Sequence, residues 1–326
     1  MMHISKILSV INGVLLSTNV VAGSLQTPPF SPYLDYTLNT HWDPQTQDMA
    51  PMDLVSPAVS QGITSFHLAF ITDSGSCQPS WGGQQDYSLA KHWGAKQADS
   101  LVAHGVELAV SFGGATGNDL SYHCTPLQLT DTFNQVIDTY HAKTLDFDIE
   151  NGTADIPKLM SAIKVTQIQH PDINLSFTLP VMPEGLTPAG KDIISAAYSA
   201  GLHFQVNIMA MDYGPAYSGD MGAYAIAAAS HTQQFLKEIY PDKSDEALWK
   251  LVKVTPMIGV NDVNTEQFTL ANVDELKKFA KNTGLGGLSM WSLSRDKPCA
   301  DKWASPVCSG NNLQHQQYEF VGHFIQ

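Results

Sequence analysis

Residues 144–150 read TLDFDIE, and this stretch carries both a structural pattern and a chemical one. Its acids are Asp146, Asp148 and Glu150, and they alternate with Leu145, Phe147 and Ile149. A β-strand places alternate residues on opposite faces, so its three acids share one face at intervals of about 6 to 7 Å. We therefore expect a strand whose apolar face packs under helices and whose acids point into a barrel.

Seven further runs of apolar, β-branched or aromatic residues recur along the chain, each bounded by Gly, Pro, Asn or Asp. These seven runs lie at residues 30–37, 62–71, 105–112, 174–181, 204–213, 251–260 and 286–293, and residues 144–150 make the eighth. Segments of helical period lie between or after them, at 88–104, 127–141, 156–170, 189–200, 223–240, 273–281 and 313–325. This alternation, without a linker, predicts an α/β protein with a single-domain (β/α)8 TIM barrel. A doubly wound open sheet is the alternative, but the Gly-rich turn expected after its first strand is absent.

In such a barrel the loops at the carboxyl ends of the strands build the active site. Polar and aromatic residues gather at these ends of the predicted strands. They are Asp35 and Tyr36 on the first, Ser111, Gly113 and Gly114 on the third, the acids on the fourth, Met211, Asp212 and Tyr213 on the sixth, and Trp291 on the eighth. We expect Met211 and Tyr213 to face inward.

Three carboxyl groups in a barrel interior cannot all be ionised, because burial and like charges both favour the neutral form. At least one proton is therefore held among them. Glu150, at the open end of the strand, is best placed to donate a proton to a substrate. Two alternatives remain open: a solvated edge strand, or a Mg²⁺ or Ca²⁺ site. Few neighbouring strand ends offer further ligands, and we predict no metal and no cofactor.

The composition limits the partners of the chain. Its 326 residues include 43% hydrophobic ones, which excludes a disordered or collagenous protein. The formal net charge of -14 argues against nucleic acid and anionic membranes as partners, because both require a basic face. A neutral ligand fits this charge better, and we expect a monomer.

Residues 1–22 have the pattern of a secretory signal peptide. Lys6 precedes a mostly apolar run at 7–21, and small residues stand before Gly23. The run is too short and too polar for a membrane-spanning helix. We expect cleavage near Ala22, a mature chain of residues 23–326, secretion, and no membrane association afterwards.

The four cysteines are expected to form disulfides after export, because an oxidising compartment favours them. Their spacings match no zinc pattern. Three pairings are possible, and the short separation of Cys299 and Cys308 favours a local bridge, which leaves Cys77 to pair with Cys124. Four free thiols are the alternative.

Four motifs together resemble glycoside hydrolase family 18, the chitinases. They are SFGG at 111–114, LDFDIE at 145–150, MAMDY at 209–213 and MWSLSRD at 290–296. They stand in order on the third, fourth, sixth and eighth predicted strands, and the resemblance covers essentially the whole mature chain.

The resemblance implies a retaining, substrate-assisted cleavage of β-1,4 bonds between N-acetylglucosamine units, in which the acetamido oxygen of the sugar is the nucleophile. By resemblance, Glu150 is the acid and base, Asp148 orients the acetamide, and Asp146 shares a proton with Asp148. Tyr213 would bind the acetamide carbonyl, and Trp291 would form the floor under the sugar. The third-strand residues implied beside the acids are Ser111, Gly113 and Gly114.

The chain departs from the family pattern at two positions. Lys143 stands where the family has an acid, three positions before Asp146. Gly214 follows Tyr213, where an acid or amide is common, and Asp212 would replace that side chain only if a bend turned it inward.

We therefore expect a secreted chitinase with an open cleft and endo-type cutting, whose partners are chitin or N-acetylglucosamine oligosaccharides. Trp42 and Trp81 are candidates for stacking on flanking sugars. An endo-β-N-acetylglucosaminidase acting on N-glycans would use the same acids. A chitin-binding lectin would usually lack the acid that Glu150 provides.

Overall fold

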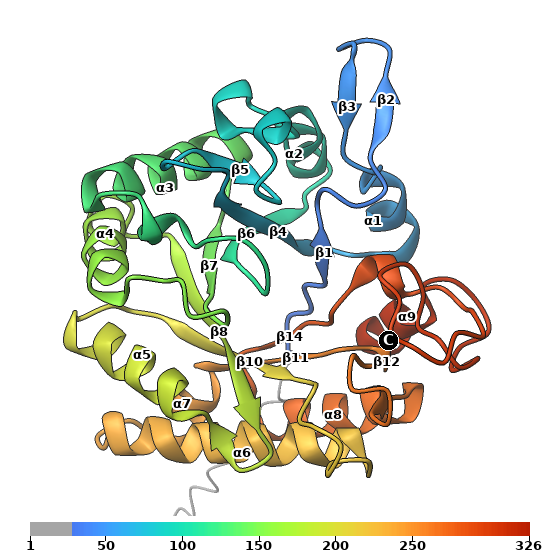
Figure 1. Ribbon diagram of the computed structural model, residues 1–326. Helices are drawn as coiled ribbons and strands as arrows, with labels where there is room; N and C mark the ends of the chain where they lie inside the picture. Colours follow the sequence, from blue (N-terminus) through green and yellow to red (C-terminus); the bar gives the residue numbers. More distant parts are fainter. Residues whose placement is uncertain (1–27) are drawn as a thin grey trace, which may run out of the picture.

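The computed structural model describes residues 28–326, which form a closed barrel of eight parallel strands surrounded by helices (Figure 1). The strands follow the order β1-β4-β6-β7-β8-β10-β11-β14. Their bounds are Tyr33–Asp35, Ser65–Asp73, Glu107–Gly113, Thr144–Asp148, Asn174–Met182, Gln205–Ala210, Val252–Pro256 and Gly287–Leu288. A parallel bridge between Phe30 and Leu288 joins the last strand to the first. The predicted TIM barrel is confirmed.

Helices follow the strands and cover the outside of the barrel. They are α1 (Val55–Gln61), α2 (Ala95–Ala103), α3 (Pro126–Tyr140), α4 (Ile156–Gln169), α5 (Pro188–Ser199), α6 (Met221–Ile239), α7 (Asp245–Trp249), α8 (Leu270–Thr283) and α9 (Glu319–Ile325). Side-chain caps begin several of them: Thr125, Asp155, Thr187, Asp220 and Thr269 each accept a backbone N–H of the first turn. The short helices α1 and α7 were not predicted.

The last helix is shorter than predicted, because it begins at Glu319 and not near residue 313. The carboxylate of Asp296 accepts the N–H groups of Phe320 and Val321, at 3.2 and 2.8 Å. Asp296 also accepts the side-chain amide of Gln314 at 2.8 Å. These bonds hold the preceding segment in an irregular conformation and fix where the helix starts.

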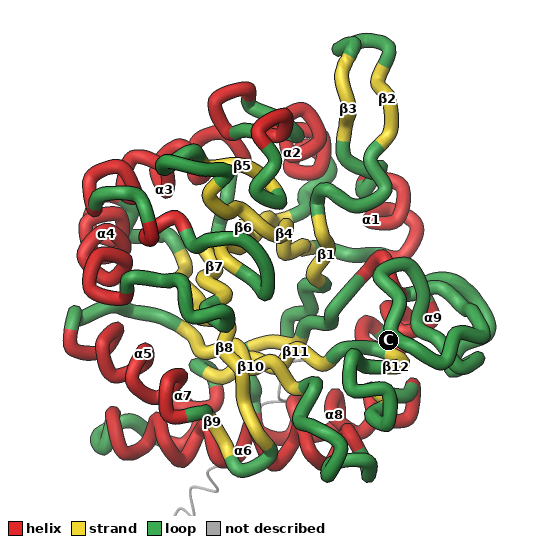
Figure 2. The backbone as a smooth tube through the Cα atoms, viewed as in Figure 1, coloured by secondary structure: helices red, strands yellow, loops and turns green. Residues whose placement is uncertain are grey.

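Shorter elements extend the loops around the barrel. The strands among them are β2 (His41–Asp43), β3 (Asp48–Ala50), β5 (Pro79–Trp81), β9 (Gly185–Leu186), β12 (Gly259–Val260) and β13 (Gln267–Phe268). The 3-10 helices are η1 (Gln85–Tyr87), η2 (Leu89–Lys91), η3 (Leu120–Tyr122) and η4 (Leu293–Arg295). The hairpin of β2 and β3 projects away from the barrel (Figure 2).

The alternation in β7 divides its side chains as predicted. Phe147 packs outward, with its ring centroid 5.6 Å from Phe112 on β6 and 5.3 Å from Phe133 on α3. Asp146 and Asp148 face inward and are buried. The apolar residues of this strand therefore attach helices to the barrel, while the acids occupy its interior.

Two strands that carry site residues end earlier than predicted. β7 ends at Asp148 and β10 at Ala210, so Glu150 and Tyr213 lie in the loops that follow. Asp212 has a φ of 52°, in the left-handed region, and this turn breaks the alternation of side chains. The predicted strand at 204–213 is therefore too long, and its inward and outward sides change after Met211.

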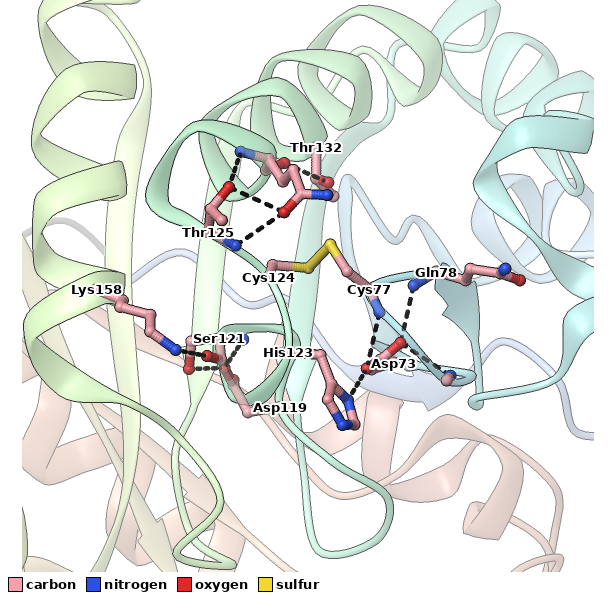
Figure 3. Close-up of a disulfide and its surroundings, with 12 residues drawn as sticks. Asp73, Cys77, Gln78, Asp119, Ser121, His123, Cys124, Thr125, Thr132 and Lys158 are labelled. Carbon is pink, nitrogen blue, oxygen red and sulfur yellow. Dashed lines mark hydrogen bonds and ion pairs between the residues drawn. A yellow bond between two sulfur atoms is a disulfide. The ribbon is translucent and has the colours of Figure 1, made fainter.

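Both predicted disulfides are present, Cys77–Cys124 and Cys299–Cys308. Figure 3 shows the first of them, which joins the loops after β4 and β6. Beside it, the carboxylate of Asp73 accepts hydrogen bonds from Nδ1 of His123 at 2.6 Å and from the backbone N–H of Gln78 at 2.8 Å. The backbone N–H of Asp73 also bonds to the carbonyl oxygen of Asn118, at 3.0 Å. The two loops are thus joined both covalently and by hydrogen bonds.

The prediction that Trp81 contacts sugars is wrong. Its side chain is fully buried, and its indole N–H donates to the hydroxyl of Tyr140 at 3.0 Å. Trp42, in the projecting hairpin, is 59% exposed, and its predicted contact with sugars stays a prediction.

No helix within residues 28–326 has the length and apolar character needed to cross a membrane. The predicted signal peptide at 1–22 lies outside the described residues.

We expect the two disulfides to contribute unequally to stability. The chain-entropy model assigns about 4 kcal/mol to a bridge across 47 residues and about 2.5 kcal/mol to one across 9 residues. In urea unfolding, Cys77→Ser/Cys124→Ser should therefore lose more of the free energy of unfolding than Cys299→Ser/Cys308→Ser. An equal or reversed order would contradict this expectation.

Candidate active site

A cavity of about 200 Å³ lies at the carboxyl ends of the barrel strands. Four acids line it, and they are Asp148, Glu150, Asp212 and Asp262. Its apolar wall is formed by Phe70, Met209, Met211, Met257 and Trp291. The structure therefore brings two of the strand acids together with the predicted Met211, Asp212 and Trp291.

Asp146 lies below the cavity at the centre of the barrel and is fully buried. Its carboxylate accepts hydrogen bonds from the hydroxyls of Tyr33 and Thr178, both at 2.8 Å. Ser111 and Ser176 donate to it as well, both at 2.5 Å. Four donors fill the lone-pair positions of an ionised carboxylate. The geometry therefore fits an ionised Asp146 that is held in place by hydroxyls from β1, β6 and β8.

Asp148 has a different environment, although it stands only two residues further along β7. It is 5% exposed, and its Oδ1 has no hydrogen-bond partner within residues 28–326. Burial and the negative charges of Glu150 and Asp146 raise its pKa well above the usual value. These causes favour the neutral, protonated form of Asp148. The described hydrogen bonds of Asp146 go to hydroxyl groups, so its sharing of a proton with Asp148 stays a prediction.

Glu150 lies in the loop after β7 and lines the cavity. Burial and the negative charge of Asp212 raise its pKa to about 7. A carboxyl group with this pKa holds its proton in mildly acidic solution and exchanges it near neutrality. Glu150 therefore meets the requirement of a general acid that afterwards acts as a base.

The turn at Asp212 points this side chain into the cavity. Its Oδ1 accepts the N–H of Val263 at 3.0 Å, which connects the loop after β10 to the loop after β11. In the opposite direction, the buried carboxylate of Glu266 accepts the N–H groups of Tyr213 and Gly214, at 3.1 and 2.7 Å. The two loops thus hold each other through hydrogen bonds between carboxylates and backbone amides. Because the turn directs Asp212 inward, its carboxylate can replace the side chain that Gly214 lacks.

Tyr213 does not line the cavity, contrary to the predicted inward orientation. It is 5% exposed, and its ring centroid lies 5.9 Å from Tyr217 and 6.1 Å from Tyr224. The physical reason is the left-handed turn at Asp212, which reverses the sides that these two residues face. Its hydroxyl is buried without a hydrogen-bond partner among residues 28–326, and its predicted contact with a sugar stays a prediction.

Small residues at the end of β6 allow the backbone to approach β7. A Cβ atom on Gly113 would lie 2.1 Å from the carbonyl oxygen of Asp148, which leaves no space for a side chain. The N–H of Gly114 donates to the same oxygen at 3.0 Å. Together with the Ser111 hydroxyl on Asp146, the SFGG motif supports both inward acids of β7.

Trp291 and two aromatic residues missed by the sequence analysis form one side of the cavity. The ring of Trp291 stacks on Phe70 with centroids 5.6 Å apart, and Tyr33 lies at 6.4 Å. Tyr33 faces inward by strand alternation, a signal that was available in the sequence. The predicted Tyr36 instead packs outward against Trp81.

Asp262 was also missed, because it stands in an irregular loop with no motif around it. Asp35, predicted at the strand end, accepts hydrogen bonds from Thr37 and does not line the cavity.

Potential metal ligands converge at one place in residues 28–326, at Cys299, Asp301 and Cys308. The two sulfur atoms there form a disulfide and are not available as thiolate ligands. The acids around the cavity do not form such a group.

No protein-family model matches the chain, but individual proteins do. It is 33% identical over 293 residues to a probable bifunctional chitinase/lysozyme of Escherichia coli K12, a match covering 82% of this chain and 31% of that protein. It is 32% identical over 293 residues to endochitinase 11 of Metarhizium anisopliae, covering 83% and 53%. The chain thus spans about a third and about half of the lengths of these two relatives.

This chain is also similar to a solved structure over nearly the full length of both. Catalytic-site mutants of active domain 2 of a thermostable chitinase from Pyrococcus furiosus, complexed with chito-oligosaccharides, are 36% identical, with a TM-score of 0.81. The match covers 92% of this chain and 94% of that one. These similarities join the barrel, the four motifs and the acid-lined cavity in one conclusion: the chain belongs to the chitinases of glycoside hydrolase family 18.

Proposed function

We propose that this chain hydrolyses the β-1,4 bonds between N-acetylglucosamine units in chitin and its oligosaccharides, with retention of configuration. The observation that carries the proposal is the pair formed by Asp148 and Glu150 in one cavity. Glu150 holds its proton up to about pH 7, and Asp148 is buried with a free oxygen atom. Glu150 can thus donate a proton to the leaving oxygen, and Asp148 can accept a hydrogen bond from the acetamide of the sugar. These two groups suit a substrate whose own acetamide oxygen is the nucleophile.

The reaction follows from these two groups. Oδ1 of Asp148 accepts the acetamide N–H, which holds the acetamide carbonyl oxygen under the anomeric carbon. That oxygen attacks as the bond to the glycosidic oxygen breaks, and Glu150 donates its proton to the leaving oxygen. Glu150 then removes a proton from water, which attacks the anomeric carbon and opens the oxazolinium ring.

The remaining residues have supporting roles in this proposal. Trp291 and Phe70 form an apolar surface against which a sugar ring packs, and Met211 extends it. Burial raises the pKa of Glu150, and the negative charge of Asp212 raises it further. Tyr213 is not among the residues that line the cavity, and no step of the proposed reaction depends on it.

We also propose that the protein is exported after removal of residues 1–22, since its two disulfides suit an oxidising compartment. N-terminal sequencing of the exported protein should begin at Gly23, and retention of the intact leader would contradict this.

Substrate range tests the proposed reaction directly. Oligomers of N-acetylglucosamine should be cleaved, whereas fully deacetylated chitosan and cellulose oligomers should be inert, because neither carries an acetamide oxygen. NMR of the first product should show the retained anomer. Cleavage of cellulose oligomers at a comparable rate, or an inverted product, would exclude the mechanism. Release of glycans from a glycoprotein, without cleavage of chitin oligomers, would favour the N-glycan alternative.

Replacement of Glu150 by glutamine should remove the proton donor while keeping the shape of the side chain. We expect kcat to fall by roughly 10² to 10⁴, as is usual for loss of a general acid, with oligosaccharide binding retained. Initial rates and calorimetric titration with chitin oligomers measure the two effects separately. Glu184→Gln, on a surface loop outside the cavity, is the matched control. A fully active Glu150→Gln enzyme would refute the assignment.

The pH dependence should show the link between Glu150 and Asp212. Because Glu150 must be protonated, kcat/KM should decline as the pH rises through about 7. The negative charge of Asp212 raises this pKa, so Asp212→Asn should shift the alkaline limb to lower pH. The exposed Asp192→Asn should leave it unchanged. An alkaline limb that persists unshifted in Asp212→Asn, or that disappears in a His variant, would contradict the link.

A further inference from the structure

A buried ammonium group lies inside the barrel, on the side opposite to the active-site cavity. Lys253 on β11 is 8% exposed, and its Nζ lies 3.2 Å from Nε2 of His67 on β4. His67 is itself 1% exposed. A buried lysine normally requires a compensating charge, and the imidazole beside it does not provide one.

The hydrogen bonds of His67 define which group carries the charge. Its Nδ1 lies 2.8 Å from the hydroxyl and 3.0 Å from the carbonyl oxygen of Ser31. The carbonyl oxygen can only accept and the hydroxyl can donate to Ser65 at 2.9 Å, so we assign the hydrogen atom to Nδ1. Nε2 is then the acceptor of the Lys253 ammonium. Burial and the nearby Lys253 charge also lower the pKa of His67 well below its usual value. Lys253 is therefore the cation and His67 its neutral partner.

Side-chain contacts connect Lys253 to Asp146. The ring of His67 stacks on Tyr33, with centroids 4.4 Å apart, and the Tyr33 hydroxyl donates to Asp146 at 2.8 Å. Asn207 is the register partner of Lys253, and its amide donates to the same hydroxyl at 2.9 Å. Burial lowers the pKa of Lys253 below its usual value, and the negative charge of Asp146 opposes this lowering. Two side chains, those of His67 and Tyr33, thus lie between Lys253 and Asp146 in this series of contacts.

Few other charges face this pair. Glu107 of β6 lines the cavity of about 520 Å³ at the lower mouth of the barrel, together with Lys253 and His67. Above Asp146 lie the four acids of the active-site cavity, which are Asp148, Glu150, Asp212 and Asp262. Near the last two, Arg295 donates to the backbone carbonyls of Ile258 and Val260. Among the described residues that line the two cavities, Lys253 is the only lysine or arginine.

We propose that Lys253 is a positioning residue whose buried ammonium keeps Asp146 ionised and leaves the protons of the site on Asp148 and Glu150. A negative Asp146 receives four hydroxyl donors, and it also disfavours a second charge on Asp148. Lys253 therefore acts on the reaction through Asp146, without touching the sugar. This inference rests on the proposed function, because its main readout is the pH profile of chitin hydrolysis.

Lys253→Met keeps the length of the side chain and removes its charge. Ionising Asp146 then becomes less favourable. The pH at which kcat/KM falls on the acidic side of the profile should therefore rise by about one unit, which is roughly a tenfold loss of kcat/KM at pH values below that point. Little should change on the plateau. Lys143→Met, which removes an exposed charge, is the matched control and should keep the wild-type profile. An unshifted limb in folded Lys253→Met, or a uniform loss at every pH, would overturn the proposal.

A second measurement uses the wild-type protein and does not depend on the folding of a variant. NMR of protein labelled at the lysine Cε carbon, with Lys253 identified by its contact with the His67 ring, reports the charge of the amine. The proposal requires an ammonium form throughout the pH range of activity, and a neutral amine there would refute it. If the wild type cleaves no chitin oligomer, the proposed function fails, while this titration still tests the Lys253 charge.

Discussion

The centre of this protein is an anion that has no access to water. Burying the Asp146 carboxylate would be very unfavourable alone, and the chain compensates with hydroxyls from β1, β6 and β8. Those hydroxyls must come from strands at fixed register, so the charge and the barrel depend on each other. This charge also affects the chemistry above it, because burial and the negative charges of Glu150 and Asp146 together raise the pKa of Asp148.

The second determinant of the site is the conformation of one residue. The left-handed turn at Asp212 exchanges the sides that Asp212 and Tyr213 face, and Glu266 and Val263 fix the exchange through backbone amides. An acid therefore stands opposite Glu150 where strand alternation alone would place a phenol. Burial raises the pKa of Glu150, and the exchange adds the negative charge of Asp212, which raises it further, to about 7.

Most of the fold followed from periodicity, because eight alternating runs leave few arrangements other than a barrel. The inward acids of β7 and the Cys299–Cys308 bridge also followed from local pattern, and this bridge left Cys77 to pair with Cys124. Prediction from the sequence failed where tertiary contacts decide the local structure. Tyr213 was predicted to face inward, Trp81 was predicted to be accessible to sugars, and the last helix was predicted to start several residues before Glu319. Asp262 had no pattern at all. Lys253 was not recognised, because its role depends on β4 and β1, which are distant in the sequence.

The joined loops after β4 and β6 have a consequence for ligand affinity. The Cys77–Cys124 bridge, the Asp73 carboxylate and the bond from Asp73 to Asn118 hold the segment that contains Ala115, a residue of the cavity wall. A wall that is rigid before a sugar arrives loses little conformational entropy when the sugar binds. The contact energy of the sugar is then available for distorting its ring toward the transition state, and little of it is needed to order the protein.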